Sequence, residues 1–337
     1  MPPSPKRPTI KDIAAATGLS PAAVSYALRG LQVPQETQDR VRNAADMLGY
    51  EAHPAARALA SGRTGTIGVL CGSLQDLWQQ SLSSALGRAL LDVGRNALIV
   101  DAVGDGGREA RMSKHLADQR VDALITIAVD PRSPHWELIA QQLALVSIGD
   151  RLPKASTVSE VVFDNDAGVL SSLTTLAEAG HRQVTVLTPG RGGAADRPAD
   201  RAVLQIAPGL GVDATLVSCP HDLTGATEIA LAELQGERRP TAFFCLTDSM
   251  AYGVYAAVRD LALTVPDDVS VLGYDDHPVS RLLTPPLSTC RWDIAKIVEA
   301  AIDRVVTALD TDRRRRALVL APEPQMRDSV GPPSGPR

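Results

Sequence analysis

The stretch TIKDIAAATGLSPAAVSYALRG, residues 9–30, decides how this chain begins to fold. A threonine opens it and Asp12 follows three residues later, which is the spacing of a helix-capping box. Gly18 suits the left-handed residue that ends a helix, and the serine–proline pair after it suits the start of another. Apolar residues recur at helical period within both segments. The stretch therefore predicts helices over 10–17 and 21–29 joined by a short turn, which is a helix-turn-helix.

A third helix is predicted over 35–48, with Val41, Ala45 and Leu48 facing inward. The three helices together form an all-α head over residues 8–50. The second helix keeps five residues on its outer face, where a groove of DNA can receive them: Pro21, Ala22, Ser25, Tyr26 and Arg29. For the hairpin taken by itself, an amphipathic pair that packs and does nothing else is the alternative.

The distribution of charge supports a nucleic-acid partner for the head. The 337-residue chain has a net charge of −5, but residues 1–63 carry eight basic and five acidic residues and are +3. The remainder, with 26 basic and 34 acidic residues, is −8. A basic head on an acidic body directs a polyanion to one end of the molecule.

Composition also indicates the compartment and the number of domains. The length suits two or three domains, and the 44% hydrophobic content is that of a globular protein. The four cysteines are scattered without metal-ligand spacing, which is typical of free thiols in a reducing compartment. With no apolar run of membrane-spanning length and no secretion signal, we expect the protein in the cytoplasm, associated with the nucleoid.

The segment PAARALAS, residues 54–61, lies in the hinge or linker that we assign to 51–64. It is about two helical turns long, which is far below the length at which an isolated helix is stable in water. It is therefore either a plain linker or a helix that forms only when another molecule orders it.

From Thr66 onward, short β-branched runs alternate with helical stretches, a pattern that predicts parallel sheets covered on both faces. The pattern occurs twice, which indicates two α/β lobes around a cleft where the carboxyl ends of the strands face a ligand. Residues 65–163 and 293–316 supply the first lobe and the crossover elements, 164–292 the second lobe, and 323–337 a C-terminal tail. Strands are predicted over 66–71, 97–102, 121–129, 144–149, 161–163, 183–188, 214–218, 241–246, 269–274 and 317–320, and helices over 82–93, 108–119, 167–179, 224–235 and 248–261.

The sequence shows no motif of a known catalytic site. The glycine clusters at 104–107 and 190–193 fit neither a dinucleotide-binding nor a phosphate-loop pattern, so both are predicted to be loops. The triplet Asp275-Asp276-His277 follows a strand and is chemically able to bind a metal or transfer protons, but no nucleophile or carboxylate cluster accompanies it. We therefore predict no enzymatic activity, no cofactor and no metal.

Several blocks resemble the lactose-repressor (LacI/GalR) family of bacterial transcription regulators. Besides residues 9–30, the resemblance rests on ETQDRV (36–41), LGY (48–50), ARALASGRTGTIGV (56–69), DNDAG (164–168), GHR (180–182), TDSMAYGV (247–254), VPDDVSVLGYDD (265–276) and PPLST (285–289). It implies a repressor that binds a pseudo-palindromic operator as a homodimer. It also implies a periplasmic-binding-protein-like body that senses a small molecule, a sugar or a related metabolite.

The resemblance also implies roles for individual residues. The DNA-binding residues are Thr9, Ser20, Pro21, Ala22, Ser25, Tyr26 and Arg29 in the head and Ala56 and Leu59 in the hinge, where Leu59 matches a leucine that wedges between base pairs in the minor groove. The effector-binding residues are Trp78, Asp150, Arg197, Arg201, Thr247 and Asp275. Either of the two arginines matches the ligand-binding arginine of the family.

Three positions allow more than one interpretation. Asp248 suits a helix N-cap and Asp276 a structural turn better than a ligand site. The run Arg313–Arg316 suits a solvated loop better than a DNA contact, because it belongs to the body. For the protein as a whole, the alternative to an effector-controlled regulator is an architectural DNA-binding protein whose pocket senses nothing.

Overall fold

The computed structural model describes residues 8–31, 33–50, 62–157, 159–190, 197–311 and 313–334. The chain forms two compact units, residues 1–64 with the head and residues 65–337 with the body. The predicted hinge helix, with Ala56 and Leu59, lies outside the described residues. Within the described ranges, no helix is long and apolar enough to span a membrane.

The head is a three-helix unit of α1 (Ile10–Thr17), α2 (Pro21–Leu28) and α3 (Gln35–Leu48). The backbone N–H of Thr9 donates to Asp12 at 2.7 Å, and Gly18 has a φ of 68°, so the predicted cap and stop are confirmed. Pairwise contacts among the helices bury a small apolar core: Ile13, Ala14, Val24, Ala27, Val41 and Ala45. The prediction that Leu48 faces inward is wrong, because it is 38% exposed and Tyr50 packs against this core instead.

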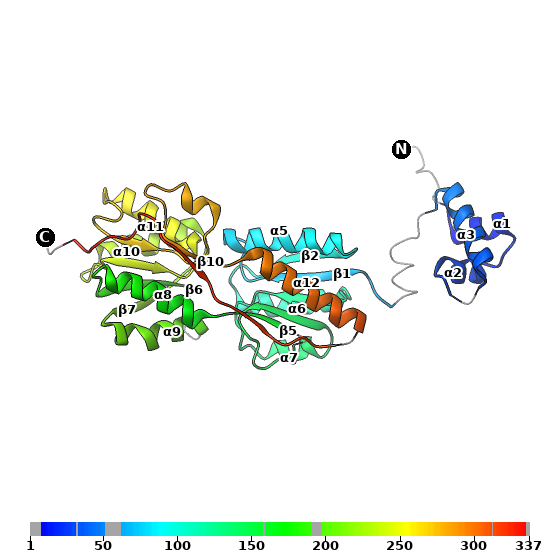
Figure 1. Cartoon of the computed structure of the whole chain (residues 1–337), viewed down its shortest axis with the longest axis horizontal. Helices are drawn as coiled ribbons and strands as arrows, with labels where there is room; N and C mark the ends of the chain where they lie inside the picture. The colour runs from blue at the N-terminus through cyan, green and yellow to red at the C-terminus, as the bar shows by residue number, and fades with distance from the viewer. Residues whose placement is uncertain are drawn as a thin grey trace. The chain divides into compact units, whose positions relative to one another are not determined.

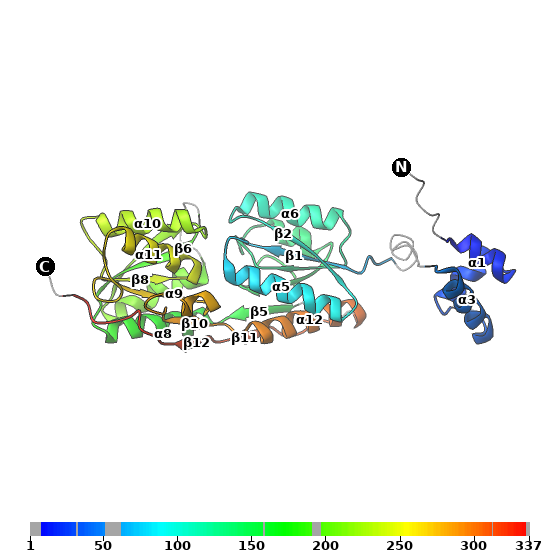
Figure 2. The same cartoon turned by 90° about the horizontal axis from the view of Figure 1, so that it is seen from above.

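The first lobe of the body is a six-stranded parallel sheet in the order β11-β5-β4-β3-β1-β2. Its strands are β1 (Thr66–Cys71), β2 (Asn96–Asp101), β3 (Ala123–Thr126), β4 (Ala144–Gly149), β5 (Ser159–Phe163) and β11 (Leu318–Leu320). Its helices are α5 (Leu77–Asp92), α6 (Gly106–Asp118), α7 (His135–Ala140) and α12 (Ile294–Thr311). Because α5 and α12 cover one face and α6 and α7 the other (Figures 1 and 2), the central strands are apolar on both sides.

The second lobe is a four-stranded parallel sheet in the order β7-β6-β8-β9. Its strands are β6 (Gln183–Pro189), β7 (Asp213–Cys219), β8 (Ala242–Cys245) and β9 (Ser270–Leu272). The helices are α8 (Asn165–Glu178), α9 (Pro198–Ile206), α10 (Leu223–Gln235) and α11 (Asp248–Asp260), with short 3-10 turns at Ala207–Leu210 and Pro278–Arg281. Helices α10 and α11 pack closely at Gly253, where an added Cβ would lie 2.4 Å from the Cβ of Ala226.

Three chain connections join the lobes. The first runs from β5 into α8, the second from β10 (Thr289–Arg291) into α12, and the third from β11 into β12 (Glu323–Gln325). Strands β10 and β12 pair antiparallel, so the second and third connections are tied together. Beyond β12 the C-terminal segment is bonded into the second lobe, since Ser329 Oγ donates to the Val271 carbonyl at 2.6 Å.

Several helix boundaries differ from those predicted from the sequence, and the reason is the same for each. Helix α5 begins five residues before the predicted start, because Asp76 caps it by accepting the N–H of Gln79 at 2.9 Å. The glycine cluster at 104–107 is not wholly a loop, since Asp105 caps α6 and Gly106 begins it. In each case a polar cap lies outside the periodic apolar pattern by which the helix was recognised. Helices α7, α9 and α12 were not predicted.

Candidate functional site

The outer face of α2 carries the residues that the sequence assigns to DNA. Pro21 and Ala22 are exposed, and Tyr26 is 42% exposed. The guanidinium carbon of Arg29 lies 5.2 Å from the centre of the Tyr26 ring, a cation–π contact that restricts the ring and leaves its hydroxyl at the surface. This face therefore offers apolar surface and a phenol rather than a cluster of cations.

The two polar residues at the start of the head helices also cap them. Ser20 Oγ accepts the N–H of Ala23 at 3.2 Å, which leaves its own proton for an outside acceptor. The Thr9 hydroxyl donates to Asp12 at 2.7 Å. Ser20 is thus able to cap α2 and donate to a phosphate at once, while Thr9 has its donor engaged within the head.

A cavity of about 530 Å³ lies between the two lobes of the body. It is lined at the carboxyl ends of parallel strands from both sheets, the position where α/β folds bind ligands. Of the predicted effector-binding residues, the cavity is lined by Trp78, Asp150, Arg197, Thr247 and Asp275, whereas Arg201 is not among the described lining residues. The structure thus places one of the two candidate arginines in the cavity.

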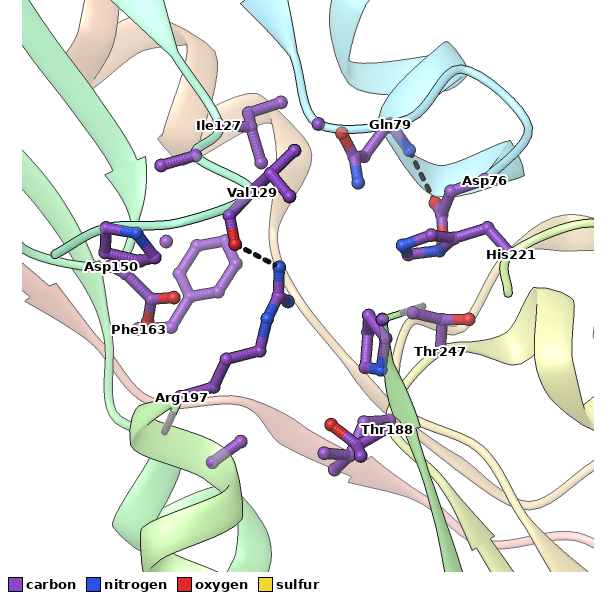
Figure 3. Close-up of a pocket in the computed structure, with 18 of the residues that line it drawn as sticks. Asp76, Gln79, Ile127, Val129, Asp150, Phe163, Thr188, Arg197, His221 and Thr247 are labelled. Carbon is purple, nitrogen blue, oxygen red and sulfur yellow. Dashed lines mark hydrogen bonds and ion pairs between the residues drawn. The ribbon is translucent and has the colours of Figure 1, made fainter. Parts of the chain in front are cut away.

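Side-chain hydrogen bonds cross the cleft and connect the two lobes. Arg197, the residue before α9, donates from Nη2 to the Val129 carbonyl of the first lobe at 3.0 Å (Figure 3). The Nδ1 of His221 lies 3.3 Å from an oxygen of Asp76. The N–H of Leu77 donates to Ser249 Oγ at 3.1 Å. A ligand that enters the cavity contacts groups from both lobes. Its binding energy therefore depends on the distance between the lobes.

Aromatic side chains form one wall of the cavity. The rings of Phe163 and Trp292 stack with centroids 4.2 Å apart, and Trp78 meets Phe163 edge-on at 5.7 Å. Trp292 donates from Nε1 to the Tyr274 carbonyl at 3.0 Å. Trp78 is only 5% exposed, so little of its ring is open to stacking, but its Nε1 has no hydrogen-bond partner among the described residues. This wall suits a ligand with an apolar ring face.

Carboxylates dominate the polar lining. Burial raises the pKa of Asp150, the charges of Arg197 and Arg201 oppose that rise, and Asp200 adds to it. The pKa of Asp275 lies well above its usual range because of burial and then the nearby charges of Asp76 and Asp248. Buried carboxyl groups of this kind gain from N–H and O–H donors and lose from another negative charge. The cavity therefore favours a donor-rich neutral ligand over an anion.

Asp248 organises the loops behind the cavity and does not cap α11. That role belongs to Thr247, whose Oγ1 accepts the N–H of Met250 at 3.3 Å, so the predicted N-cap at Asp248 is wrong. The carboxylate of Asp248 instead accepts five hydrogen bonds of 2.5 to 3.2 Å. They come from the backbone of Tyr274, Asp275 and His277 and the hydroxyls of Ser280 and Thr289.

Asp276 has the structural turn role that the sequence favoured. It has a φ of 51°, in the left-handed region, and its carboxylate pairs with Arg281 at 3.2 Å and with Arg327. The contact with Arg327 links this turn to the C-terminal segment.

Sequence reasoning missed several residues that line the cavity, notably Asp76, Phe163, His221 and Tyr274. Phe163 ends β5, while His221 and Tyr274 follow shortly after β7 and β9. Their common signal is a position at the carboxyl end of a parallel strand, which is readable in the sequence once the strands are placed. The Asp76–His221 contact joins residues 145 positions apart and has no local signal.

A buried carboxyl group supports the loop that Arg197 touches. Glu109 of α6 accepts the N–H groups of Val129 and Asp130 at 2.5 and 3.1 Å. Burial raises its pKa to about 7, against the effect of both hydrogen bonds. The protonation of Glu109 is thus coupled to the part of the first lobe that forms the cavity wall.

We expect this coupling to make stability depend on pH. A carboxyl group whose pKa is higher in the folded state stabilises the fold fully below its ordinary value of 4.5, and this contribution is lost as the pH rises to about 7. Between those values wild type should lose about 2 kcal/mol of unfolding free energy relative to Glu109→Gln. Urea denaturation at pH 5 and pH 8 measures the difference. Glu137→Gln, at an exposed site on α7, should retain the wild-type dependence, and an identical pH profile for Glu109→Gln would contradict the prediction.

Comparisons with known proteins agree with this architecture. A model of the family described as bacterial regulatory proteins, lacI family, matches residues 9–53. A model of a periplasmic binding protein-like domain matches residues 173–330. The first match covers the helix-turn-helix, and the second covers most of the second lobe and the connections to the C-terminal segment.

Individual relatives extend the similarity over nearly the whole chain. The HTH-type transcriptional repressor PurR of Aliivibrio fischeri is 27% identical over 334 residues, which cover 96% of this chain and 98% of that protein. The ribose operon repressor of Haemophilus influenzae is 27% identical over 332 residues with the same coverage. Both relatives are repressors rather than enzymes.

A solved structure shares the fold. The lac repressor dimer bound to operator and the anti-inducer ONPF aligns with a TM-score of 0.78 at 20% identity, covering 97% of this chain and 100% of that one. The chain therefore carries a DNA-binding region of the lacI family of bacterial regulatory proteins at residues 9–53 and a periplasmic binding protein-like domain at 173–330, and it is a DNA-binding transcriptional regulator controlled by a small-molecule effector.

Proposed function

We propose that the protein is a repressor that binds a pseudo-palindromic operator as a homodimer, with one head reading each half-site. The exposed face of α2 supports this, because Pro21, Ala22 and Tyr26 lie together on a helix that begins with a capped turn. Two-fold related heads read half-sites in successive major grooves. The solved lac repressor is likewise a dimer bound to its operator.

The chemistry of this face indicates how bases are read. Pro21 and Ala22 offer apolar contact to thymine methyl groups, and Tyr26 offers a hydroxyl where an arginine would grip guanine with two bonds. Ser20 and Ser25 contact phosphates, which position the head without specifying sequence. Insertion of Leu59 into the minor groove, with Ala56 three residues before it in the sequence, supplies further discrimination by bending the DNA.

The effector that we propose is a neutral, hydroxyl-rich compound, a sugar or a related metabolite, bound in the cavity between the lobes. The observation that carries this is the lining itself: the half-buried carboxyl group of Asp150, the buried carboxyl group of Asp275, Arg197 as a donor, and an aromatic wall beside them. Because the effector contacts both lobes, its binding shifts the equilibrium between arrangements of the body that differ in operator affinity.

The test has two parts. A thermal-shift screen of the purified protein against neutral sugars, nucleosides and sugar phosphates should identify neutral compounds that raise Tm. A hit should then change the affinity for an operator selected by the protein from random duplexes. If operator binds tightly and no neutral compound alters either measurement, the proposal of a neutral, hydroxyl-rich effector is wrong.

Replacing Tyr26 by alanine should weaken binding to the selected operator by about 1 to 3 kcal/mol, the value of one good base contact. Tyr26→Phe keeps the ring beside Arg29 and should separate the loss of the hydroxyl from the loss of the side chain. Met47→Ala, at a residue of α3 that is 89% exposed, is the matched control and should bind normally. Unchanged affinity and base preference for Tyr26→Ala in a footprinting titration would refute the assignment.

A further inference from the structure

Four consecutive arginines, Arg313–Arg316, lie between α12 and β11 in a body whose net charge is −8. All four residues are exposed. Side-chain partners account for two of them, because Arg315 pairs with Asp303 at 2.9 Å and Arg314 donates to Ser156 Oγ at 2.7 Å. Within the described part of the chain, Arg313 and Arg316 have no side-chain hydrogen bond or ion pair. The loop is thus a concentrated positive surface on an otherwise acidic unit.

The backbone of this loop is fixed in place. The carbonyl of Arg316 accepts a hydrogen bond from Arg304 of α12 at 3.1 Å and another from Ser159 of β5 at 3.4 Å. With the Arg314–Ser156 bond, the loop is attached through Arg314 and Arg316 to α12, β5 and the segment before β5. A ligand therefore binds to it without first ordering a flexible chain, which lowers the entropic cost of binding.

The loop lies at the end of the first-lobe sheet where the strands begin, which is also where the linker from the head enters the body. All strands of the first lobe are parallel, so the segment before β1 and the segment before β11 both reach the end of the sheet where the strands begin. Figures 1 and 2 show α12 ending at the side of the first lobe where β1 begins. Four strand spacings separate β11 from β1, which is about 19 Å. The start of β11, which follows the arginines in the sequence, thus lies about the width of a DNA duplex from the start of β1, where the linker from the DNA-binding unit enters.

We propose that Arg313 and Arg316 contact phosphates of the DNA that flanks the sequence read by the heads. The proposal rests on operator binding by the head, to which the body is joined through the linker that leads into β1. Guanidinium groups suit phosphate oxygens in charge and geometry, and such contacts add affinity without base specificity. An arginine run on an acidic body is difficult to explain as a means of solubility, because acidic residues already provide net charge.

The experiment uses full-length protein and two duplexes. The short duplex contains only an operator selected by wild type from a random pool, and the long duplex adds about one helical turn, roughly 10 base pairs, on each side. The variant is Arg313→Gln/Arg316→Gln. The matched control, Arg238→Gln/Arg239→Gln, removes the same charge from exposed residues between α10 and β8 of the second lobe. Kd is measured for each duplex from 50 to 200 mM salt.

We expect wild type and the control to bind the long duplex more tightly than the short one. The variant should lose this advantage, about tenfold, and its plot of log Kd against log salt should flatten by about 1 for each phosphate that the protein no longer neutralises. On the short duplex, which lacks the flanks, variant and control should bind alike; equal Kd and equal salt dependence of the two on the long duplex would overturn the proposal. Tight binding of the short duplex by wild type with no gain from the flanks refutes only the loop, whereas failure to bind either duplex refutes operator binding itself.

Discussion

Replacing Asp248 by alanine is expected to lower the free energy of unfolding of the body by about 3 to 5 kcal/mol. The substitution removes one carboxylate that accepts hydrogen bonds from three backbone N–H groups and two hydroxyls, all inside the second lobe. Each buried donor left without an acceptor costs about 1 to 3 kcal/mol, and part of that is recovered where water enters. Urea denaturation followed by tryptophan fluorescence, with Trp292 nearby, measures the change.

Two comparisons make this prediction specific. Asp166→Ala removes an exposed carboxylate from the first turn of α8 and should cost at most about 1 kcal/mol, the effect of a charge on the helix dipole. Asp248→Asn keeps the shape of the side chain but directs its NH2 group at some of the same donors. Its loss of unfolding free energy should therefore lie between those of Asp248→Ala and Asp166→Ala. A loss for Asp248→Ala no larger than that for Asp166→Ala would show that the loops of residues 274–289 are held by something else.

Replacing Arg197 by alanine should weaken effector binding by about 10- to 100-fold, equivalent to the loss of one or two charge-assisted hydrogen bonds. Arg197 is the arginine that the structure places in the cavity, and it also forms the bond to Val129 across the cleft. The variant should therefore reduce both affinity and the response of operator binding to the effector. Calorimetric titration with the compound identified by thermal shift measures the first effect.

The matched control is Arg201→Ala, because Arg201 is one helical turn further along α9 and outside the described cavity lining. It should change effector affinity by less than about threefold, since no direct hydrogen bond to the effector is removed. The reverse result, with Arg201→Ala impaired and Arg197→Ala normal, would assign the ligand-binding role to Arg201 and contradict the geometry described above.

The sequence by itself determined the elements whose signals are local. In the head, the capping residues, Gly18 and the apolar period define α1 at its observed bounds and α2 to within one residue, because each depends on contacts three or four positions apart. The alternation of strands and helices likewise predicted two parallel α/β lobes, since strands buried on both faces are continuously apolar. The family resemblance supplied the role of the body.

Tertiary structure decided what depends on distant parts of the chain. Whether Arg197 or Arg201 enters the cavity is undecided in the sequence, because both lie at the start of the same short helix and only the position of the opposite lobe separates them. The Asp76–His221 contact and the five bonds to Asp248 join residues far apart in sequence, so no periodicity predicts them. For the arginine run, the sequence favoured a solvated loop. The position of this loop at the end of the sheet where β1 begins follows only from the parallel pairing of β11 with β5. That pairing brings the segment before β11 back to the end of the first lobe where the linker enters.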